Sequence, residues 1–512
     1  MKTFIPAFIV VLAVASIGAE PDPTVAVTGG LVRGDTLGDG GAVFKGIPYA
    51  QPPVGGLRWR EPMPVKPWTG THDATAFGAT CAQNPAFRQP GSVEEDCLFV
   101  NLWTPEWPSR SLMPVMVWIH GGGNYAGTGS SPLLDGQRLS KLGVVLVTFN
   151  YRLGSFGFLA HPALTRESPH HASGNQGILD QIAALKWVQD NIAKFGGDRS
   201  NVTIFGESAG SVDVSVLMAT PLSKGLFRRA IGQSGAVILN GNPLSRTDAE
   251  KDGVTLAAQW GVPSGASVGD LRSVSVAAVL KARDWNGAPP ASLGVVVDGY
   301  AFTERPTATF SARKAHPVAL LQGSNTRDRV FALPAELNKA ISDAYGPLAP
   351  RGHALYRSAP DPMYGTPAEQ WHTDTVFRCS TVAQLAWHAA AGNPVYQYEF
   401  ARVPPGREAV GATHSSDVAY VFGTLEKGVS GPGGPAMPNA VDRELSAQMQ
   451  QYWTNFAKTG NPNGAGLPAW PQFDDPQRAY LQFTDAGPIA RDGLRRPFCD
   501  LFIENVKRLM AP

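Results

Sequence analysis

The sequence lacks the features that would connect it with nucleic acid, metal ions or a membrane. Its 43 basic and 42 acidic residues give a formal net charge of only +1, which gives no electrostatic argument for nucleic acid or an anionic membrane as partner. Neither Cys-x-x-Cys nor His-Glu-x-x-His occurs, and His170-His171 is an isolated pair, so we predict no metal site. Beyond the N-terminus, no apolar run is long enough to span a bilayer. We therefore expect a small-molecule partner and a monomer without stable membrane insertion.

Long linkers, internal repeats and blocks of like charge are absent as well. The Gly/Pro-rich piece at residues 430–435 is short and is typical of a surface loop. A length of 512 residues alone would suggest about three domains. Because nothing marks a boundary, we instead expect one large domain with insertions over residues 20–512, and 43% hydrophobic residues can supply its core.

The N-terminus carries an apolar stretch of its own. Met1-Lys2-Thr3 is followed by apolar residues from Phe4 to Val14 and then by small residues, which is typical of a secretory signal peptide. The stretch is too short to cross a membrane, and no cysteine at its end offers a lipid anchor. We predict a signal peptide over residues 1–19, with cleavage after Ala15 or Ala19, and a secreted or periplasmic protein.

The most informative segment that is present runs from Val202 to Gly210. Its β-prone residues lead into Gly206-Glu207-Ser208-Ala209-Gly210, a Gly-x-Ser-x-Gly turn that opens onto apolar, helix-compatible sequence. A serine hydroxyl is a poor nucleophile near neutral pH, so it needs a sharp turn where a base and oxyanion-binding amides can reach it. The segment predicts a nucleophile elbow with Ser208 as nucleophile, although the motif alone is weak evidence and its context must decide.

The surrounding sequence predicts an α/β fold. Apolar residues from Ile178 to Ile192 recur at three- and four-residue steps, Asn175 is placed to cap this helix, and Gly196-Gly197 ends it. The almost wholly apolar runs 114–119 and 144–149 are typical of parallel strands that are covered on both faces. Helix, glycine stop, strand, elbow and helix form one α/β unit.

A glycine loop, His120-Gly121-Gly122-Gly123, directly follows the first of these strands. Acyl transfer develops a negative oxygen, which preorganised backbone amides stabilise better than mobile water. We assign Gly122, Gly123 and Ala209, the residue after the nucleophile, as the oxyanion donors. By itself the segment is also compatible with a merely flexible glycine loop, but its combination with the elbow favours the catalytic interpretation.

The base and acid should follow the serine in the order acid, then histidine. Four histidines follow position 328, and His414 is the best placed, because it comes after the strand-like run 394–400 and an irregular loop. His388, in a helical stretch, is better explained as a packing residue. Asp328 lies just after the strand-like run 317–323 and is our candidate acid, which would orient the imidazole and stabilise its charged form. A lone loop aspartate is otherwise usually a turn residue or a solvated charge.

Several segments together resemble the type B carboxylesterases, the cholinesterase-like branch of the α/β-hydrolase fold. They occur in family order from about residue 25 to the C-terminus. The matching segments are Phe44 to Ala50, Pro52 to Gly55, Leu57 to Trp59, Glu95 to Leu98, His120 to Gly123, Asn150 to Gly154, Gly174 to Gly177, Phe195 to Asp198, Gly206 to Gly210 and Gln233 to Gly235.

The resemblance implies hydrolysis of carboxylic esters without a cofactor, with a mostly parallel central sheet flanked by helices and with insertions that form the pocket. By motif match it places the nucleophile on Ser208 and the base on His414, because 414–423 is similar to the family's His-Gly-x-Glu-Ile-x-Tyr-Val-Phe-Gly. It also implies roles near the triad for Glu207 and Ser234, each of which is equally compatible with an ordinary buried hydrogen bond.

The acid motif departs from the family pattern. The family shows Gly-x-Asn-x-Asp-Glu-Gly, whereas this chain has Asp328 at the glutamate position between Arg327 and Arg329. Flanking arginines favour an ionised carboxylate. They also allow an alternative in which Asp328 is captured in an ion pair and another carboxylate orients His414. Asp417 and Asp298 are poor substitutes, the first because it aligns outside the triad and the second because it is typical of a structural turn.

Four cysteines allow three pairings, and free thiols are a further alternative. The family resemblance favours Cys81 with Cys97 and Cys379 with Cys499.

The substrate is less constrained. The loop between Cys81 and Cys97 forms a lid in lipase-like relatives, but here Phe87 is its only large apolar side chain before Cys97, so we expect small or soluble esters. Two alternatives remain, a lipase for longer chains and a catalytically silent binding protein. The chain also resembles bacterial para-nitrobenzyl and fumonisin esterases in general pattern, and Arg327 and Arg329 suggest a hypothesis of attraction for anionic esters.

Overall fold

A central eleven-stranded sheet organises the molecule in the computed structural model, which describes residues 22–84, 91–238, 244–281, 295–329, 333–357, 359–427, 430–431, 434–435 and 438–510. The strand order is β20-β19-β16-β15-β12-β11-β9-β10-β8-β4-β3. The strands are β3 (Asp35–Thr36), β4 (Ala42–Pro48), β8 (Phe99–Thr104), β9 (Met113–Ile119), β10 (Val145–Phe149), β11 (Gly197–Glu207), β12 (Arg229–Gln233), β15 (Ala319–Asn325), β16 (Val395–Phe400), β19 (Ala479–Thr484) and β20 (Gly487–Asp492).

The sheet is parallel in its centre and antiparallel at both edges. Strands β10, β9, β11, β12, β15, β16 and β19 run parallel to their neighbours, whereas β8, β4 and β3 on one side and β20 on the other are antiparallel. Parallel strands need crossover connections, so helices lie on both faces. The carboxyl ends of the central strands therefore meet at one edge, where ligands bind in open α/β sheets.

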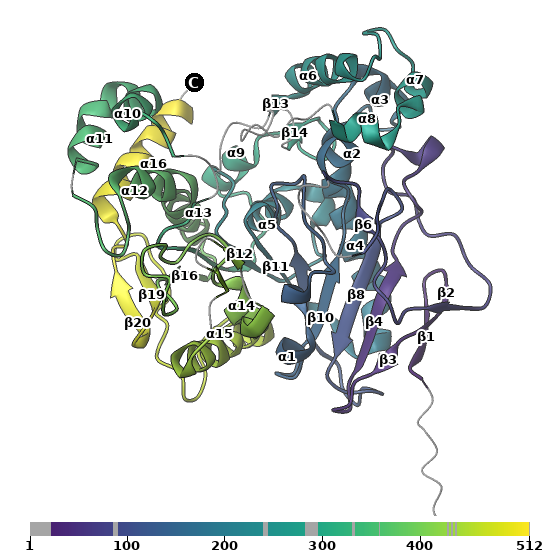
Figure 1. Ribbon diagram of the computed structural model, residues 1–512, viewed down its shortest axis with the longest axis horizontal. Helices are drawn as coiled ribbons and strands as arrows, with labels where there is room; N and C mark the ends of the chain where they lie inside the picture. The colour runs from purple at the N-terminus through teal and green to yellow at the C-terminus, as the bar shows by residue number, and fades with distance from the viewer. Residues whose placement is uncertain are drawn as a thin grey trace, which may run out of the picture.

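The helices cover both faces and form two groups at the ends of the molecule (Figure 1). Helices α10, α11, α12 and α16 gather at one end, and α3, α6, α7 and α8 gather at the other. The helices are α1 (Gln137–Ser140), α2 (Gly154–Phe158), α3 (Pro162–Glu167), α4 (Gln176–Asn191), α5 (Ala209–Ala219), α6 (Arg246–Gln259), α7 (Val268–Ser273), α8 (Val276–Lys281), α9 (Pro306–Ser311), α10 (Leu337–Tyr345), α11 (Ala349–Leu355), α12 (Pro367–Thr373), α13 (Cys379–Ala390), α14 (Val418–Phe422), α15 (Ala440–Thr459) and α16 (Arg496–Met510).

Short strand pairs decorate the periphery. They are β1 (Thr24–Val27), β2 (Gly30–Arg33) and β5 (Thr71–Asp73) in one small sheet, with the pairs β6 (Thr80–Cys81) and β7 (Val93–Glu94), β13 (Leu244–Ser245) and β14 (Val296–Val297), and β17 (Ser430–Gly431) and β18 (Gly434–Pro435).

The two faces of strand β9 show why the central strands are apolar throughout. Val115 and Val117 belong to the core on one face of the sheet, which Val214 of α5 also joins. Met116 and Trp118 belong to the core on the opposite face, together with Trp453 of α15. Because successive side chains point to opposite faces and both faces are buried, the strand has no solvent-facing side. The expected run 114–119 is thus confirmed as a buried parallel strand.

The predicted helix over Ile178 to Ile192 is α4, which continues into a short 3-10 turn, η4 (Ile192–Phe195), and stops at Gly196 with φ +83°. The expected cap is wrong in its detail. Asn175 stands at the N-cap position, but its side chain makes no capping bond and instead bonds Val296 and Asp298. A tertiary partner therefore competes successfully with the local helix terminus for this amide.

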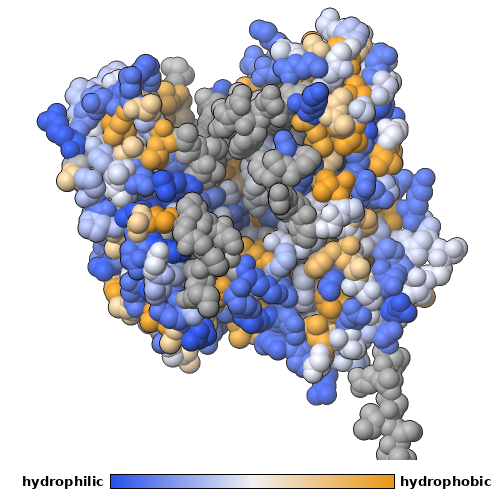
Figure 2. All heavy atoms as spheres, viewed as in Figure 1, coloured by the Kyte–Doolittle hydropathy of each residue, from blue (hydrophilic) through white to orange (hydrophobic). Residues whose placement is uncertain are grey.

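Both disulfides have the pairing that the family resemblance implies. Cys81 is bonded to Cys97, and Cys379 to Cys499. The second bond joins α13 to the C-terminal helix α16. Among the described residues no helix has the length and apolarity to cross a bilayer. The face in Figure 2 is a mixture of hydrophilic and hydrophobic residues with scattered hydrophobic patches. The expected signal peptide, residues 1–19, lies outside the described residues.

Candidate active site

Ser208 occupies a strained turn between β11 and α5. Its backbone φ of +57° and ψ of −125° lie outside the regions that side-chain-bearing residues usually adopt, and it stands at the N-cap position of α5. Its amide donates to Gln233 O at 2.8 Å, and its carbonyl accepts from Ser211 and Val212. These main-chain hydrogen bonds stabilise the strained backbone of Ser208, as a nucleophile elbow requires.

The glycines of the elbow are needed for close packing. A Cβ on Gly210 would lie 2.0 Å from Ile119 O, and one on Gly206 would lie 2.6 Å from both Gly210 O and Ile119 O. Strand β11, helix α5 and the end of β9 therefore approach more closely than any larger residue permits. This contact brings the end of β9, and the glycine loop that follows it, beside the serine.

The glycine loop lies directly against the elbow. A Cβ on Gly121 would contact Ser208 Cβ at 3.0 Å and Glu207 O at 2.6 Å. Gly122 and Gly123 have φ of +105° and +65°, and the carbonyl of Gly122 accepts from the amides of Tyr125 and Ala126. Within the described chain, the amides of Gly122, Gly123 and Ala209 donate no hydrogen bond. Three polar N–H groups thus stay available near Ser208.

His120 is the first residue of the glycine loop and does not act as a charged group. It is buried, its ring stacks on Tyr151 with centroids 4.4 Å apart, and Nδ1 lies 2.9 Å from Gly121 O. Burial lowers the pKa of His120 to about 4, although the Gly121 carbonyl opposes this shift. The imidazole is therefore neutral near pH 7 and packs the loop onto Tyr151.

Asp328 is fully buried and faces His414, although 86 residues separate them in sequence. Oδ1 lies 2.5 Å from His414 Nδ1. Oδ2 accepts from Ser234 Oγ at 2.6 Å and from the Asn325 amide at 2.9 Å. These donors fix the orientation of the carboxylate. The residues that sequence suggested as acid, base and supporting serine are thus brought together.

The flanking arginines do not capture Asp328. Arg327 donates to the main-chain carbonyls of Ala409 and Pro362, and Arg329 pairs with Glu369 at 3.2 Å. The alternative in which an arginine sequesters the acid is therefore wrong. Arg327 is therefore held by main-chain carbonyls, whereas Arg329 keeps a side chain that is 36% exposed, so attraction of anionic esters stays a prediction for Arg329.

Glu207 lies on the opposite side of the imidazole. Its Oε1 is 3.1 Å from His414 Nε2 and accepts from Ser415 Oγ at 2.6 Å. Glu207 Oε1 and His414 Nε2 are close enough for an ion pair, but they are not aligned for a hydrogen bond. In the described part of the chain Nε2 therefore has no hydrogen-bond partner, and Ser208 does not bond it either. Catalytic hydrogen bonds often tighten only when substrate is bound. The unbonded Nε2 therefore lies next to Glu207, the residue that precedes Ser208 in the elbow.

Two carboxylates set the charge of this imidazole. Burial disfavours the imidazolium, but Glu207 and Asp328 outweigh that effect and raise the pKa of His414 to about 9. Burial raises the pKa of Glu207 to about 7, against the influence of His414 and Ser415. His414 and Glu207 therefore share a proton readily, and the two groups titrate as a coupled pair.

A buried charge cluster supports the acid loop, and sequence reasoning missed it. Arg378, in the π-helical turn η7 (Asp374–Arg378), donates to Thr326 O at 2.9 Å and to Glu399 Oε1 at 3.1 Å, and also pairs with Asp374. Arg495 reaches Asp374 Oδ2 at 2.7 Å. Asp374 lies on the same turn as Arg378, but Glu399 lies on β16, Thr326 follows β15 and Arg495 directly precedes α16, so no local motif reveals the whole cluster.

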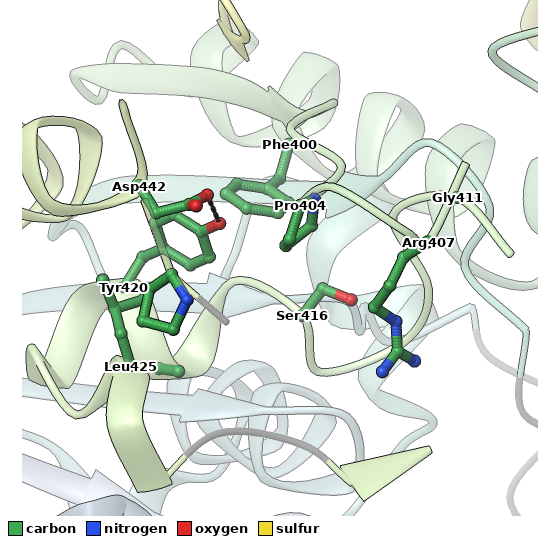
Figure 3. A pocket seen from close by; sticks show the side chains of 10 residues that line it. Phe400, Pro404, Arg407, Gly411, Ser416, Tyr420, Leu425 and Asp442 are labelled. Carbon is green, nitrogen blue, oxygen red and sulfur yellow. Dashed lines mark hydrogen bonds between the residues drawn. The ribbon is translucent and has the colours of Figure 1, made fainter. Parts of the chain in front are cut away.

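The loop that carries His414 also packs against the helices α14 and α15. Between this loop and the two helices lies a small cavity of about 60 Å³, with room for a few waters, which is shown in Figure 3. There Tyr420 of α14 donates to Asp442 Oδ1 at 2.6 Å, and Asp442 also completes the capping box of α15. Ser416, two residues after the imidazole, points into the cavity. This wall joins the base loop to two helices.

Other candidates from the sequence have structural positions. His388 is buried on α13 with Nε2 2.8 Å from Val318 O, as expected for a packing residue. Asp298 accepts from the amides of Tyr300 and Phe302 in a turn. Asp417 accepts from Gln233 and Tyr398. These partners leave Asp328 as the carboxylate bonded to Nδ1.

The fold and the strained serine turn define an α/β-hydrolase. The family model "Carboxylesterase family" matches residues 21–346 and 360–502. The chain is 37% identical to the para-nitrobenzyl esterase of Bacillus subtilis (strain 168), over 90% of this chain and 95% of that protein. It is 35% identical to a fumonisin B1 esterase of Sphingopyxis macrogoltabida, over 84% and 81%.

Solved structures give the same result. A carboxylesterase of Geobacillus stearothermophilus superimposes with a TM-score of 0.80 at 32% identity, covering 94% of this chain and 99% of that one. The chain belongs to the carboxylesterase family and hydrolyses carboxylic esters. The silent binding alternative is set aside by this result.

Proposed function

We propose that the enzyme is a serine carboxylesterase in which Ser208 is the nucleophile, His414 the general base and Asp328 the acid. The observation that carries the proposal is the bond of 2.5 Å between Asp328 Oδ1 and His414 Nδ1, because it leaves Nε2 without a hydrogen bond in the described chain and 3.1 Å from Oε1 of Glu207, the residue before Ser208. The amides of Gly122, Gly123 and Ala209 form the oxyanion hole. Their lack of other acceptors in the described chain supports this role.

The reaction follows from these positions. As Ser208 Oγ attacks the carbonyl carbon, His414 Nε2 removes its proton and the carbonyl oxygen becomes an anion between the three amides. Collapse breaks the ester bond, and the imidazolium returns its proton to the leaving alcohol. Water, deprotonated by His414, then attacks the acyl-enzyme, and a second collapse releases the acid and regenerates Ser208.

Two contacts of the loop between Cys81 and Cys97, one hydrogen-bonded and one an ion pair, favour small or soluble esters over long-chain lipids. Gln83 bonds both the carbonyl and the amide of Gly127, at 2.9 and 3.0 Å. Glu95 forms a bidentate pair with Arg58, whose side chain is 10% exposed. Both ends of the loop between Cys81 and Cys97 are therefore fastened to the body, which disfavours a lid that opens onto lipid. Phe87 lies outside the described residues.

Site-directed loss of the hydroxyl tests the mechanism. We expect p-nitrophenyl acetate turnover by the purified protein, its loss in Ser208→Ala, and a fluorophosphonate adduct that mass spectrometry localises to the peptide with Ser208. Full activity in Ser208→Ala, or labelling of another residue, refutes the assignment. A series of p-nitrophenyl esters of increasing acyl length then distinguishes the two substrate classes, because a lipase prefers the long chains.

We further infer that the protein is exported and acts as a monomer. The two disulfides support an oxidising compartment. N-terminal sequencing of the protein from culture medium and periplasm tests export and selects between cleavage after Ala15 and Ala19. Light scattering after size exclusion tests the monomer.

A further inference from the structure

A second buried carboxylate lies under the glycine loop and has no part in the proposed triad. Asp213 of α5 is fully buried. Its Oδ1 accepts from Asn124 Nδ2 at 3.1 Å, and its Oδ2 accepts from Gln181 Nε2 of α4 at 2.6 Å. Within the described chain no arginine, lysine or histidine lies at ion-pair distance from it. Burial of a carboxylate without a counter-ion costs free energy, and hydrogen bonds offset that cost only in part. The role of these hydrogen bonds follows from the residues that donate them.

Asn124 is the residue that directly follows the glycine loop. Its φ is +64°, its carbonyl accepts from the Gly154 amide at 2.7 Å, and its side-chain oxygen accepts from Tyr151 Oη at 3.0 Å. Tyr151 Oη also lies 2.8 Å from His120 O, at the start of the loop. Asn124 therefore links the end of the loop to α5 and, through Tyr151, to the beginning of the same loop.

The helix that bears Asp213 also bears one of the proposed oxyanion donors. Ala209 and Asp213 are four residues apart on α5, so they lie on one helix face a turn apart. Gly122 and Gly123 come from a different segment, yet their amides must point at the same oxygen as that of Ala209. A misplacement of about 1 Å between reacting groups can cost about a hundredfold in rate.

We propose that Asp213 is a positioning residue that holds the glycine loop in register with the nucleophile helix through Asn124. The inference rests on the proposed function, because it assigns the loop amides to the oxyanion. It concerns different contacts, since in the described chain Asp213 and Asn124 form no hydrogen bond or ion pair with His414 or Asp328.

The anchor needs hydrogen bonds and not charge. Burial raises the pKa of Asp213 to about 7, against the bonds from Gln181 and Asn124. The titratable groups nearest to it in the network are His120, which is neutral, and Tyr151, whose pKa burial raises above its usual value. Gln181 Oε1 is buried without a hydrogen-bond partner in the described chain. Rotation of this amide would let it accept from a protonated Asp213, or from an asparagine at that position.

Three single variants test the proposal. Asp213→Ala removes the anchor, and Asp213→Asn keeps one acceptor for Asn124 and one donor for a rotated Gln181. Ser215→Ala is the matched control, because Ser215 is a buried residue on the same helix that bonds Ser211 O and Gln384, away from the loop. Each variant is measured for kcat and KM with p-nitrophenyl acetate, for inhibition by a trifluoromethyl ketone, and for melting temperature.

We expect kcat of Asp213→Ala to fall about 10- to 100-fold with KM within threefold, and affinity for the ketone, whose adduct places an oxyanion in the hole, to fall by a similar factor. Asp213→Asn should stay within threefold of wild type, and Ser215→Ala within twofold at a comparable loss of melting temperature. Wild-type kcat in Asp213→Ala overturns the proposal, as does an Asp213→Asn variant as impaired as Asp213→Ala.

Asn124→Gly tests the anchor from the loop side and serves if Asp213→Ala does not fold. Glycine adopts the positive φ freely, so the change removes the side chain without new strain. We expect a similar drop in kcat, and a double variant no worse than either single one. Additive losses would overturn the proposal. Activity in Ser208→Ala would refute the proposed function, whereas an inactive Ser208→Ala beside a fully active Asp213→Ala refutes the anchor alone.

Discussion

Different interactions hold together the two sides of the site, the nucleophile side around Ser208 and the acid side around Asp328. On the nucleophile side, β9, β11 and α5 approach each other through glycines, with a Cβ on Gly210 only 2.0 Å from Ile119 O. On the acid side, β15, β16 and η7 are joined by buried charges, with Arg378 between Asp374 and Glu399. Close packing therefore shapes the first region, and electrostatic interactions shape the second.

This difference predicts how each region responds to change. A close contact fails by steric overlap, which displaces backbone whatever the pH. A charged contact fails by loss of a partner or a proton, so its failure depends on pH and on hydrogen-bond polarity. Substitutions on each side should therefore give distinguishable signatures.

The largest effect is expected from Asp328→Asn on the acid side. Ser234 and the Asn325 amide both donate to Oδ2, so an asparagine keeps its oxygen there and turns its NH2 toward His414 Nδ1. That donor forces the ring proton onto Nε2, where the base is needed. We expect kcat to fall by about 10⁴ with the melting temperature nearly unchanged. The matched control is Asp298→Asn, a buried turn carboxylate outside the site, and equal losses in both variants would contradict a catalytic role.

A smaller loss is expected from Gly210→Ala on the nucleophile side. The added methyl overlaps Ile119 O, so α5 must move away from β9 and carry the elbow with it. We expect kcat to fall about 100-fold and the free energy of unfolding to fall by about 1 to 3 kcal/mol, at every pH measured. Gly269→Ala is the control, because its nearest neighbour is Ser267 Oγ at 3.5 Å in the short helix α7. Wild-type stability and rate in Gly210→Ala would show that the contact is not tight.

Glu207→Gln should move a pH profile more than a rate. Removing the negative charge beside Nε2 destabilises the imidazolium, so the pKa of His414 falls from about 9. Because the neutral imidazole is the active base, the acid limb of kcat/KM against pH should move down by about one unit. Glu426→Gln, a surface carboxylate paired with Arg138, should leave the profile in place. A limb that stays fixed or moves up in Glu207→Gln would contradict the pairing.

The smallest effect is expected from Arg329→Ala. Its partner is Glu369, and its side chain is 36% exposed, so the pair contributes about 0 to 1 kcal/mol to stability. We expect turnover of neutral and of anionic p-nitrophenyl esters to stay within twofold of wild type. A selective loss for the anionic ester would instead support the hypothesis that this arginine attracts substrate.

The same difference explains what the sequence reveals. Gly206 and Gly210 leave a local signature because the tight turn needs them at fixed spacing, and the strands on either side are equally visible as apolar runs. Asp328 is indicated by its place after a strand and by the family's acid motif, and Ser234 by resemblance alone. The side-chain partners of the acid, Ser234 and His414, lie 94 and 86 residues from it, so spacing carries no information about them.

Some features could not be found in the sequence at all. Arg378 bonds Glu399 and Thr326, which are 21 and 52 residues away, and Asn124 meets Asp213 across 89 residues. The side chain of Asn175 shows the opposite failure, because a local rule predicted a cap while the amide bonds β14 instead. Polar side chains with several possible partners are settled by tertiary structure, which the local pattern does not contain.

The disulfide between α13 and α16 gives the acid side a special covalent topology. It closes residues 379–499 into a ring that contains His414, whereas Ser208 and Asp328 lie outside the ring. A single protease cut inside the ring therefore leaves both fragments attached to one another. Nicked enzyme should migrate as one band on a non-reducing gel and separate into two only after a thiol is added.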